Sequence, residues 1–338
     1  MLNDRKSKVL DIIVGDYIAT ASPVASEAVA RRYPMGVSPA TIRNDMADLE
    51  EEGYVTHPHT SAGRVPLDKG YRYYVESLMG EKPLPAEEQV AIRQYFTDMA
   101  GELEGWARLA ARLLSRLVHN AALVTLPKAA SCRLQRLELV SLQDFLALMV
   151  IVLKEAKLRQ QLLSLQEAIT QEDLGRMAHF LTTTLAGLNT AEIQSRAAEF
   201  SPLEAHVVRS LVEIMGGVDR GELEEPYLDG LSYFLSQPEF MRRAEVVELM
   251  GVLEEKSFFK SFLPRALGEN GIQAVIGGEN EQNALRHCSV VLARYGVPGR
   301  VTGVIGVVGP TRMPYDRIFP TVRYLSSVMS GMVAELYG

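Results

Sequence analysis

The sequence lacks several features that mark secreted and membrane proteins. Its first residues, MLNDRKSKVL, contain neither the apolar core nor the small-residue cleavage site of a signal peptide. The longest aliphatic run, Phe145 to Leu153, is about half of what a transmembrane helix needs and predicts a buried strand. The 2 cysteines, Cys132 and Cys288, have no CxxC spacing. One disulfide between them is an alternative, but two buried free thiols in a cytoplasmic protein are the preferred interpretation.

A broad excess of positive charge is also missing. The 338 residues carry a net charge of −7, and the first 80 contain 9 Lys and Arg against 11 Asp and Glu. A protein that coats nucleic acid nonspecifically needs a broad basic face, so the composition argues against that class. A small head that reads one DNA site is compatible with the same balance. With 47% hydrophobic and 23% charged residues, the chain has the composition of a folded protein of two or three domains.

Arrangements typical of enzymes and metal sites are scarce as well. No Ser-His-Asp, Cys-His or paired-carboxylate pattern can be argued, so we expect neither an enzyme nor a cofactor. His57 and His59 have no third ligand nearby and are interpreted as loop or wing residues rather than metal ligands. Gly277-Gly278 lacks the rest of a phosphate-binding loop and predicts a turn. Arg312 precedes the last helix and is expected to tie its loop to the sheet rather than to bind an anion.

The first 80 residues contain three helices in a regular order. Apolar residues at helical spacing predict a helix from Asp4 to Thr20, and Ser26 to Tyr33 predicts a short second helix. Ser38 is expected to cap a third helix that ends near Gly53. Pro39 falls in its first turn, where a missing N–H costs nothing.

A hairpin and a fourth helix follow. Two short extended segments around a tip at residues 61–63 are predicted in the stretch YVTHPHTSAGRVP, and a helix begins at Asp68. The order helix, helix, turn, helix, hairpin is that of a winged helix-turn-helix, whose recognition helix enters the major groove of DNA. We therefore interpret residues 1–80 as a DNA-binding domain.

The third helix separates its residue types by face. Ile42, Met46 and Leu49 share one face at i, i+4 and i+7, and this face is predicted to pack on the preceding helices. The opposite face carries Ala, Thr, Arg and Asn near its N-terminal end. Arg and Asn pair bidentately with guanine and adenine, and Ala and Thr methyl groups contact thymine methyl groups. The candidate DNA-binding residues of this helix, the hairpin and the fourth helix are Ser38, Ala40, Thr41, Arg43, Asn44, His57, His59, Thr60, Ser61, Arg64, Lys69 and Arg72.

The C-terminal end of the same helix carries the opposite charge. Glu50, Glu51 and Glu52 would be repelled by phosphate, so this end is expected to tilt out of the groove. The residues before it form the expected reading end. The plainer alternative is an ordinary capped amphipathic helix on a protein surface.

The rest of the chain predicts a sheet domain interrupted by an insertion. Residues 81–86 form a polar, proline-containing linker. We expect helix and then strands in 87–170, a mostly helical insertion in 171–267, and strands with a closing helix in 268–338. Three short strands and one helix make a thin core, so one shared sheet is favoured over two separate α+β domains. Because Pro320 falls early in the closing helix, the predicted start of that helix could shift by one turn. The predicted strands are Arg136 to Leu142, Ala147 to Leu153, Leu158 to Leu165, Ile272 to Ile276, Val290 to Arg294 and Val301 to Val308.

Three stretches resemble a known family. They are PVASEAVARRYPMGVSPATIRNDMADLEEEGYVTHPHTSAGRVPLDKGYRYYV, YLDGLSYFLSQPEF and GVIGVVGPTRMPYDRIFPTVRYLS. They resemble the HrcA family of heat-inducible transcription repressors, and the likeness covers essentially the whole chain. The resemblance implies a multidomain α+β protein. Its parts would be an N-terminal winged helix-turn-helix, a GAF-like α/β sheet domain, and a mostly helical dimerisation insertion within that domain.

The resemblance also implies partners. Members repress chaperonin and DnaK-type chaperone operons at normal temperature by binding a double-stranded DNA inverted repeat, and they depend on the GroEL chaperonin to stay active. An inverted repeat demands a two-fold symmetric protein, so we expect a homodimer, without a membrane partner. The rival hypothesis is a metabolite-sensing GAF-type transcription regulator. The expected dimerisation residues are Phe234, Leu235, Phe240, Leu249, Leu253, Phe258 and Phe259.

Overall fold

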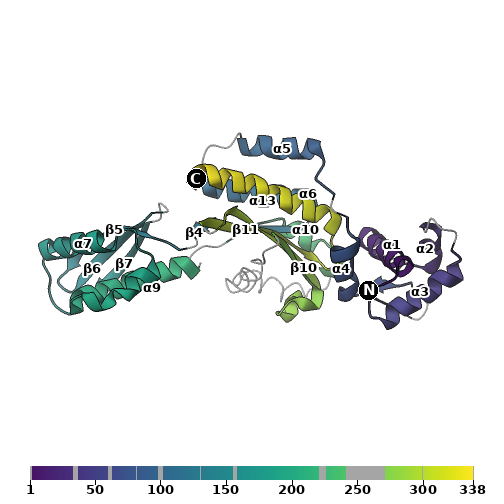
Figure 1. Ribbon diagram of the computed structural model, residues 1–338, viewed down its shortest axis with the longest axis horizontal. Coiled ribbons are helices and arrows are strands. Elements are labelled where there is room, and N and C mark those ends of the chain that lie inside the picture. Colours follow the sequence, from purple (N-terminus) through teal and green to yellow (C-terminus); the bar gives the residue numbers. More distant parts are fainter. Residues whose placement is uncertain are drawn as a thin grey trace. The chain divides into compact units, whose positions relative to one another are not determined.

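A computed structural model describes ten stretches of the chain, which form two compact units (Figure 1). The first unit combines Met1–Leu126, Glu225–Gly296 and Gly303–Gly338, and the second combines Pro127–Glu224 with Val297–Thr302. We call the second the inserted unit. The described residues are 2–32, 37–59, 63–80, 82–97, 102–129, 131–154, 158–220, 226–240, 271–298 and 300–337.

The first unit begins with three helices and a short hairpin, followed by a fourth helix and a π-helical turn. We call this part, the described residues up to 80, the head. Apolar residues of all three helices, among them Leu10, Val29 and Ile42, are fully buried and form its core. The hairpin pairs Val55 with Pro66 in antiparallel register. The elements are α1 (Asp4–Thr20), α2 (Ser26–Arg32), α3 (Pro39–Glu51), β1 (Val55–Thr56), β2 (Val65–Pro66), α4 (Asp68–Tyr73) and a π-helical turn (Tyr74–Leu78).

The rest of the first unit is built on a sheet with the strand order β8-β3-β11-β10-β9, and β4 also pairs with β11. The antiparallel pairing of β3 with β11 joins strands from the two sides of the inserted unit. We call this part the sheet domain. Its strands are β3 (Ala121–Val124), β8 (Tyr227–Asp229), β9 (Ile272–Ile276), β10 (Cys288–Val297) and β11 (Val301–Pro310). The short β4 (Lys128–Ala129) and the β11 residues that it pairs with, Val301 and Thr302, belong to the inserted unit.

Helices cover both faces of this sheet. Figure 1 shows α13 (Tyr315–Tyr337) and α6 (Leu103–Val118) together along one face, with α5 (Ala86–Thr97) outside them. On the other face, Phe234 of α10 (Leu231–Leu235) and Phe240 of the following turn (Pro238–Phe240) pack on β3, β10 and β11.

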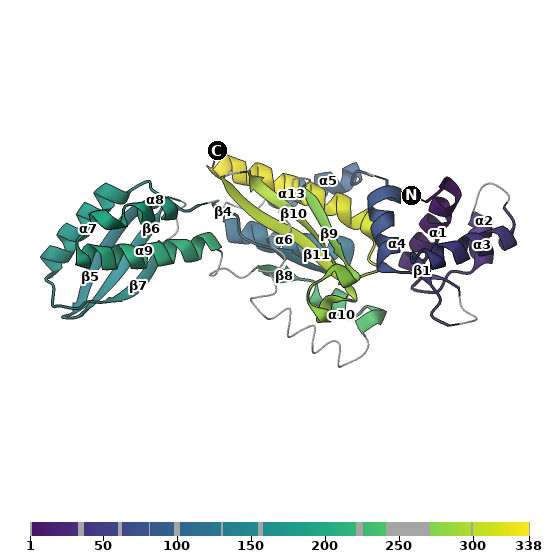
Figure 2. The same cartoon turned by 60° about the horizontal axis from the view of Figure 1, so that its bottom comes forward.

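The inserted unit is a three-stranded antiparallel sheet with helices on one face. Alternate residues of the central strand, such as Met149 and Ile151, are fully buried against α7 and α9. Figure 2 shows both long helices on the same side of these strands. The elements are β5 (Leu134–Gln143), β6 (Leu146–Leu153), β7 (Leu158–Ser164), α7 (Gln171–Leu185), α8 (Thr190–Ser195), a 3₁₀ turn (Ala197–Glu199) and α9 (Pro202–Arg220).

Two predicted boundaries are wrong. The three strands in 87–170 were expected in the interrupted sheet, but they form a separate sheet, and the inserted unit starts at Pro127 rather than at residue 171. The unit is consequently not mostly helical. At the other end, 226–240 belongs to the sheet domain, where its first residues form β8 instead of a helix. The physical reason is that β5, β6 and β7 pair with their immediate neighbours in sequence, so they close a sheet without distant partners.

Other expectations met mixed outcomes. Strand β3 is not among the predicted strands. Helix α6 ends just before it at His119, which adopts a left-handed conformation with φ of 53°. Helix α13 begins at Tyr315 and continues through Pro320. Cys132 and Cys288 are both buried, and they are not joined in a disulfide. Within the described residues, no helix is long and apolar enough to span a membrane.

Candidate nucleic-acid interface

Helix α3 begins as its sequence predicts. Ser38 has an extended backbone, and its Oγ accepts a hydrogen bond from the Thr41 N–H at 3.2 Å. Pro39 occupies the first helical turn. A serine cap satisfies one of the N–H groups that have no partner inside a helix, and proline has no N–H to leave unpaired. The N-terminal end of α3 is therefore a well-defined, capped end.

The two faces of α3 also lie as expected. Ile42, Met46 and Leu49 are buried in the head. Ala40, Arg43, Asn44, Ala47 and Asp48 are exposed, and Thr41 is half-buried. The exposed face near the cap thus combines small side chains with two side chains that can hydrogen-bond to bases.

Sequence reasoning missed one charged residue on the buried face of α3. Asp45 is 2% exposed, and its carboxylate accepts two hydrogen bonds from the Arg5 guanidinium of α1, at 2.7 and 2.8 Å. A bidentate Arg–carboxylate pair fixes the relative orientation of two elements as well as stabilising them. The available signal was the position of Asp45, three residues after Ile42 and beside Met46 on the apolar face.

Arg43 forms an exposed ion pair with Glu27 of α2, at 3.2 Å. Both side chains are more than half exposed, so the pair contributes little to stability. The pKa of Glu27 is lowered, first by a hydrogen bond from its own backbone N–H and further by Arg43. Because the pair is weak and lies at the surface, Arg43 can exchange Glu27 for another acceptor at small cost.

The acidic end of α3 is tied to the rest of the head. Lys6 of α1 lies 3.1 Å from the Asp48 carboxylate and 3.0 Å from that of Glu52. Hydrogen bonds to Glu52 and then Asp48 raise the pKa of Lys6. Lys69 donates to the Glu52 carbonyl oxygen at 2.7 Å, and its ammonium lies over the Tyr54 ring. Lys69, predicted as a DNA contact, thus stabilises the C-terminal end of α3.

Two predicted wing residues are held at the base of the hairpin. Glu50 accepts hydrogen bonds from the His57 N–H at 3.2 Å and from Arg64 Nη2 at 2.9 Å. His57 also bonds Glu50 through Nδ1 and Arg64 through Nε2. The Arg64 side chain is 13% exposed, so the prediction that it contacts the DNA backbone does not fit this conformation. Glu50, whose end of α3 is expected to tilt out of the groove, also fixes the hairpin to α3.

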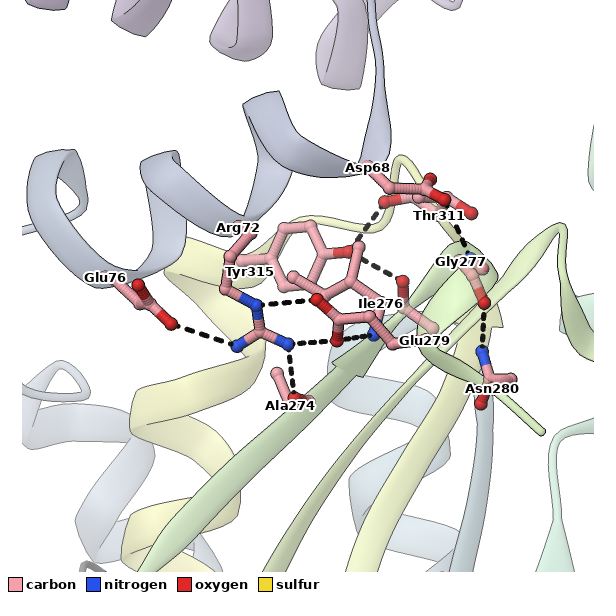
Figure 3. A network of polar contacts seen from close by, with 12 residues as sticks. Asp68, Arg72, Glu76, Ala274, Ile276, Gly277, Glu279, Asn280, Thr311 and Tyr315 are labelled. Carbon is pink, nitrogen blue, oxygen red and sulfur yellow. Dashed lines mark hydrogen bonds and ion pairs between the residues drawn. The ribbon is translucent and has the colours of Figure 1, made fainter. Parts of the chain in front are cut away.

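Arg72, also predicted as a DNA contact, is paired within the protein. Its guanidinium bonds Glu279 and the Ala274 carbonyl oxygen of the sheet domain (Figure 3). Arg72 therefore points toward the sheet domain. His59, which follows β1, is exposed, as a DNA contact requires. Thr60 and Ser61 lie outside the described residues.

The predicted dimerisation residues are in part core residues. Phe234 and Phe240 are 0% and 6% exposed, with ring centroids 4.3 Å apart, in the core of the sheet domain. Leu235 is partly buried against the same core. They were assigned to the insertion because apolar helical residues do not reveal which sheet they cover. The other four, Leu249, Leu253, Phe258 and Phe259, lie outside the described residues.

Arg312 ties its loop in place, although not to the sheet itself. Its guanidinium bonds the Glu239 carboxylate, the Gln237 side chain at 3.0 Å and the Ile18 carbonyl oxygen at 3.4 Å. These partners are on the turn after α10 and near the C-terminal end of α1. Within the described stretches, no group of three or more His, Cys, Asp or Glu is arranged to hold a metal ion.

Comparisons with known proteins identify the family. Residues 104–319 match the family model described as "HrcA protein C terminal domain". A heat-inducible transcription repressor HrcA from Roseiflexus castenholzii is 44% identical over 345 residues, which cover 100% of this chain and 96% of that protein. The repressor of the same name from Dehalococcoides mccartyi is 42% identical over 338 residues, covering 100% and 98%. The chain belongs to the HrcA family of heat-inducible transcription repressors.

A solved structure is also similar to this HrcA family member along nearly its whole length. A crystal structure of a hypothetical protein at 2.2 Å resolution matches with a TM-score of 0.64 and 25% identity. It covers 99% of both chains. The HrcA family model starts within α6, whereas the full-length relatives also span the head.

Proposed function

We propose that this protein is a dimeric repressor that binds an inverted-repeat operator of chaperone genes through its head. In this proposal the head is a winged helix, α3 is the recognition helix, and the sheet domain is GAF-like. The main observation in favour of this proposal is that the two ends of α3 differ in their exposed residues and charge. Its capped N-terminal half exposes Ala40, Arg43 and Asn44, while Lys6 and Lys69 hold its acidic end against the head.

The geometry of α3 favours one direction of insertion into the major groove. The N-terminal end of a helix carries partial positive charge and attracts phosphate, whereas the acidic end is repelled. Asn44 would pair with adenine, Arg43 with guanine, and the methyl groups of Ala40 and Thr41 would contact thymine. Since Arg64 and His57 are internally paired, His59 and the tip residues Thr60 and Ser61 remain the wing candidates for the DNA backbone.

A second copy of the chain would supply the second reading head. The outer face of the inserted sheet supports this part of the proposal, because its central strand is apolar along its length and no described helix of that unit covers it. Val140, Leu148 and Leu162 form one row across the three strands, and Val152 pairs with Leu158 in another. Leu158 and Leu162 are each 57% exposed. An apolar face of this kind is typical of a symmetric interface between identical chains.

Dependence on the GroEL chaperonin completes the proposal and is motivated by family membership. Under heat stress, misfolded proteins compete for the chaperonin, the amount of active repressor falls, and the operons are transcribed. The discontinuous sheet domain is compatible with this dependence, because β3 meets β11 only after the intervening chain has been made. Pairings so distant in sequence form slowly and leave apolar surface exposed during folding.

The test is a mobility shift on an inverted repeat from upstream of a chaperonin operon, with refolded protein and with chaperonin added or omitted. Arg43→Ala and Asn44→Ala are each expected to lose about 1–3 kcal/mol of specific binding, roughly 5- to 150-fold in affinity. Chaperonin should raise the fraction of refolded protein that binds.

Arg176→Ala is the matched control, because Arg176 is also an exposed helical arginine in one ion pair, at a site far along the chain. It should bind as the unchanged protein does. Equal operator affinity of the Arg43 and Asn44 variants would refute the assignment of α3. Full refolding without chaperonin would refute the regulatory part alone.

A further inference from the structure

The head contacts the sheet domain through a built polar interface (Figure 3). Arg72 of α4 donates from Nε to Glu279 Oε1 at 2.9 Å and from Nη2 to the second carboxylate oxygen. The same Nη2 donates to the Ala274 carbonyl oxygen of β9 at 2.8 Å. The guanidinium thus engages a side chain and the backbone of the sheet domain at once. A bidentate contact of this kind restricts orientation as well as distance.

The sheet domain holds Glu279 ready for this contact. Glu279 lies at the end of a 3₁₀ turn after β9, and its carboxylate accepts the Ile276 N–H at 2.9 Å. Asn280, 3% exposed, fixes the turn from beneath. Its Nδ2 lies 2.7, 3.1 and 2.9 Å from the carbonyl oxygens of Gly277, Leu285 and Cys288. The acceptor for Arg72 is therefore positioned by the sheet domain itself.

A second contact from the same helix reaches this turn. Asp68 accepts the Gly278 N–H at 2.7 Å. Gly277 has a φ of +53°, and a Cβ built there would overlap the Asp68 carboxylate. The turn and α4 approach each other so closely that only glycine fits at this position without movement. Asp68 and Arg72 are four residues apart on α4. They thus bind the 3₁₀ turn at two points, Gly278 and Glu279.

Beneath these polar contacts lies an aromatic pair. Tyr71 of α4 is 3% exposed and packs against Tyr315 of α13, with ring centroids 6.1 Å apart. The Tyr315 hydroxyl lies 2.7 Å from the Thr311 carbonyl oxygen and 2.8 Å from Ser289 Oγ. Burial raises the pKa of both tyrosines, so both stay neutral. The interface therefore has a buried aromatic layer next to the ion pair between Arg72 and Glu279.

Arg312 provides an independent tie at another helix of the head. It donates to the Ile18 carbonyl oxygen of α1, while Glu239 holds its guanidinium. Ile18 lies in the last turn of α1, which contains no basic residue of its own and whose carbonyl groups attract a cation. Contacts at α4 and at α1 together oppose rotation of the head about either one.

We propose that Asp68, Arg72 and Glu279 are positioning residues for operator recognition. They touch no DNA; they fix the angle at which the sheet domain presents α3. In a dimer this angle decides whether both recognition helices meet half-sites at one set spacing. This inference rests on the proposed function. Its new element is that the contact between α4 and the sheet domain selects the spacing of the operator half-sites.

The test compares full inverted repeats of several spacer lengths with a DNA that carries one half-site. Arg72→Gln and Glu279→Gln are expected to bind the single half-site like the unchanged protein. Each should bind the correctly spaced repeat about fivefold or more weakly, because a loosely held head is correctly oriented only part of the time. Their preference among spacer lengths should flatten. The double variant should be no worse than either single variant, because both changes remove one shared bridge.

Glu76→Gln is the matched control. Glu76 is also an acidic partner of Arg72, at 3.5 Å, but it lies in the head itself and is exposed. It should retain the full spacing preference. Unchanged spacing preference in the Arg72 and Glu279 variants would overturn the inference, as would an equal loss on the half-site and the full repeat. If the unchanged protein bound neither DNA, the proposed function itself would fail, which is a different result.

Discussion

Single residues decide how α3 is fixed in the head. Asp45 is almost completely buried, while the side chain of its partner Arg5 is 48% exposed. The two members of the ion pair are therefore not equivalent. An arginine that loses its partner at the surface is hydrated by water, but a carboxylate that loses its partner in the interior stays poorly solvated.

This asymmetry predicts different costs for the two neutral substitutions. Arg5→Gln leaves a buried carboxylate without its cation and should lower the free energy of unfolding by about 2–4 kcal/mol. Asp45→Asn leaves a half-exposed arginine and a neutral amide and should cost about 1 kcal/mol. Urea unfolding of the full chain, followed by circular dichroism, measures both. A larger loss for Asp45→Asn than for Arg5→Gln would contradict the prediction.

At the scale of elements, β11 and α13 contain glycines with opposite surroundings. A Cβ at Gly306 of β11 would lie 2.5 Å from the Val291 carbonyl oxygen of the neighbouring strand and would overlap Leu292. A Cβ at Gly331 of α13 would meet nothing within 4 Å. One glycine is required by the close approach of two strands, and the other only weakens a helix.

The same substitution should therefore have opposite signs at the two positions. Gly306→Ala is expected to destabilise the sheet domain by about 2 kcal/mol or more, because backbone must move to make room. Gly331→Ala should stabilise the protein by about 0.5–1 kcal/mol, because alanine favours a helix and restricts the unfolded chain. Thermal unfolding of the two variants side by side gives both signs. A neutral Gly306→Ala would show that β10 and β11 are not packed as described.

At the scale of the whole molecule, the outer face of the inserted sheet is the surface best suited to bind a second protein chain. Its central strand presents Leu146, Leu148, Val150 and Val152, all only partly buried, opposite the fully buried residues that pack on α7 and α9. The ion pair between Arg136 and Glu138 borders this apolar strip. An apolar centre with a charged edge is the usual composition of a protein interface.

Acidic substitutions on this face should separate the proposed dimer. Leu158→Glu together with Leu162→Glu places two charges where the second copy would pack, so light scattering should report monomers and operator affinity should fall. Thr183→Glu is the control, because Thr183 is exposed on α7 of the same unit. Circular dichroism should show an unchanged fold in both. If the double variant stayed dimeric, the dimer interface would have to lie on another surface.

The sequence predicted local features well and partners poorly. The faces of α3 follow from a period that involves only residues a few positions apart, so Ile42, Met46 and Leu49 could be placed inside without any tertiary information. Arg64, Lys69 and Arg72 are predicted as DNA contacts because they are basic and follow α3 in the sequence. Their acceptors are Glu50 and the Glu52 carbonyl group, both at the C-terminal end of α3, and Glu279 of the sheet domain, which charge alone does not reveal.

Sheet membership shows the same limit on a larger scale. Strand β6 alternates buried and half-buried residues, which identifies a strand but not its neighbours. Its pairing with β5 and β7, rather than with β3 or β11, depends on loops, on the helices that cover it and on which partners are nearest along the chain. The sequence by itself determined the two faces of α3, its cap at Ser38 and the family. Only the tertiary structure decided which strands share a sheet and which charges meet, because those contacts join residues that no local period connects.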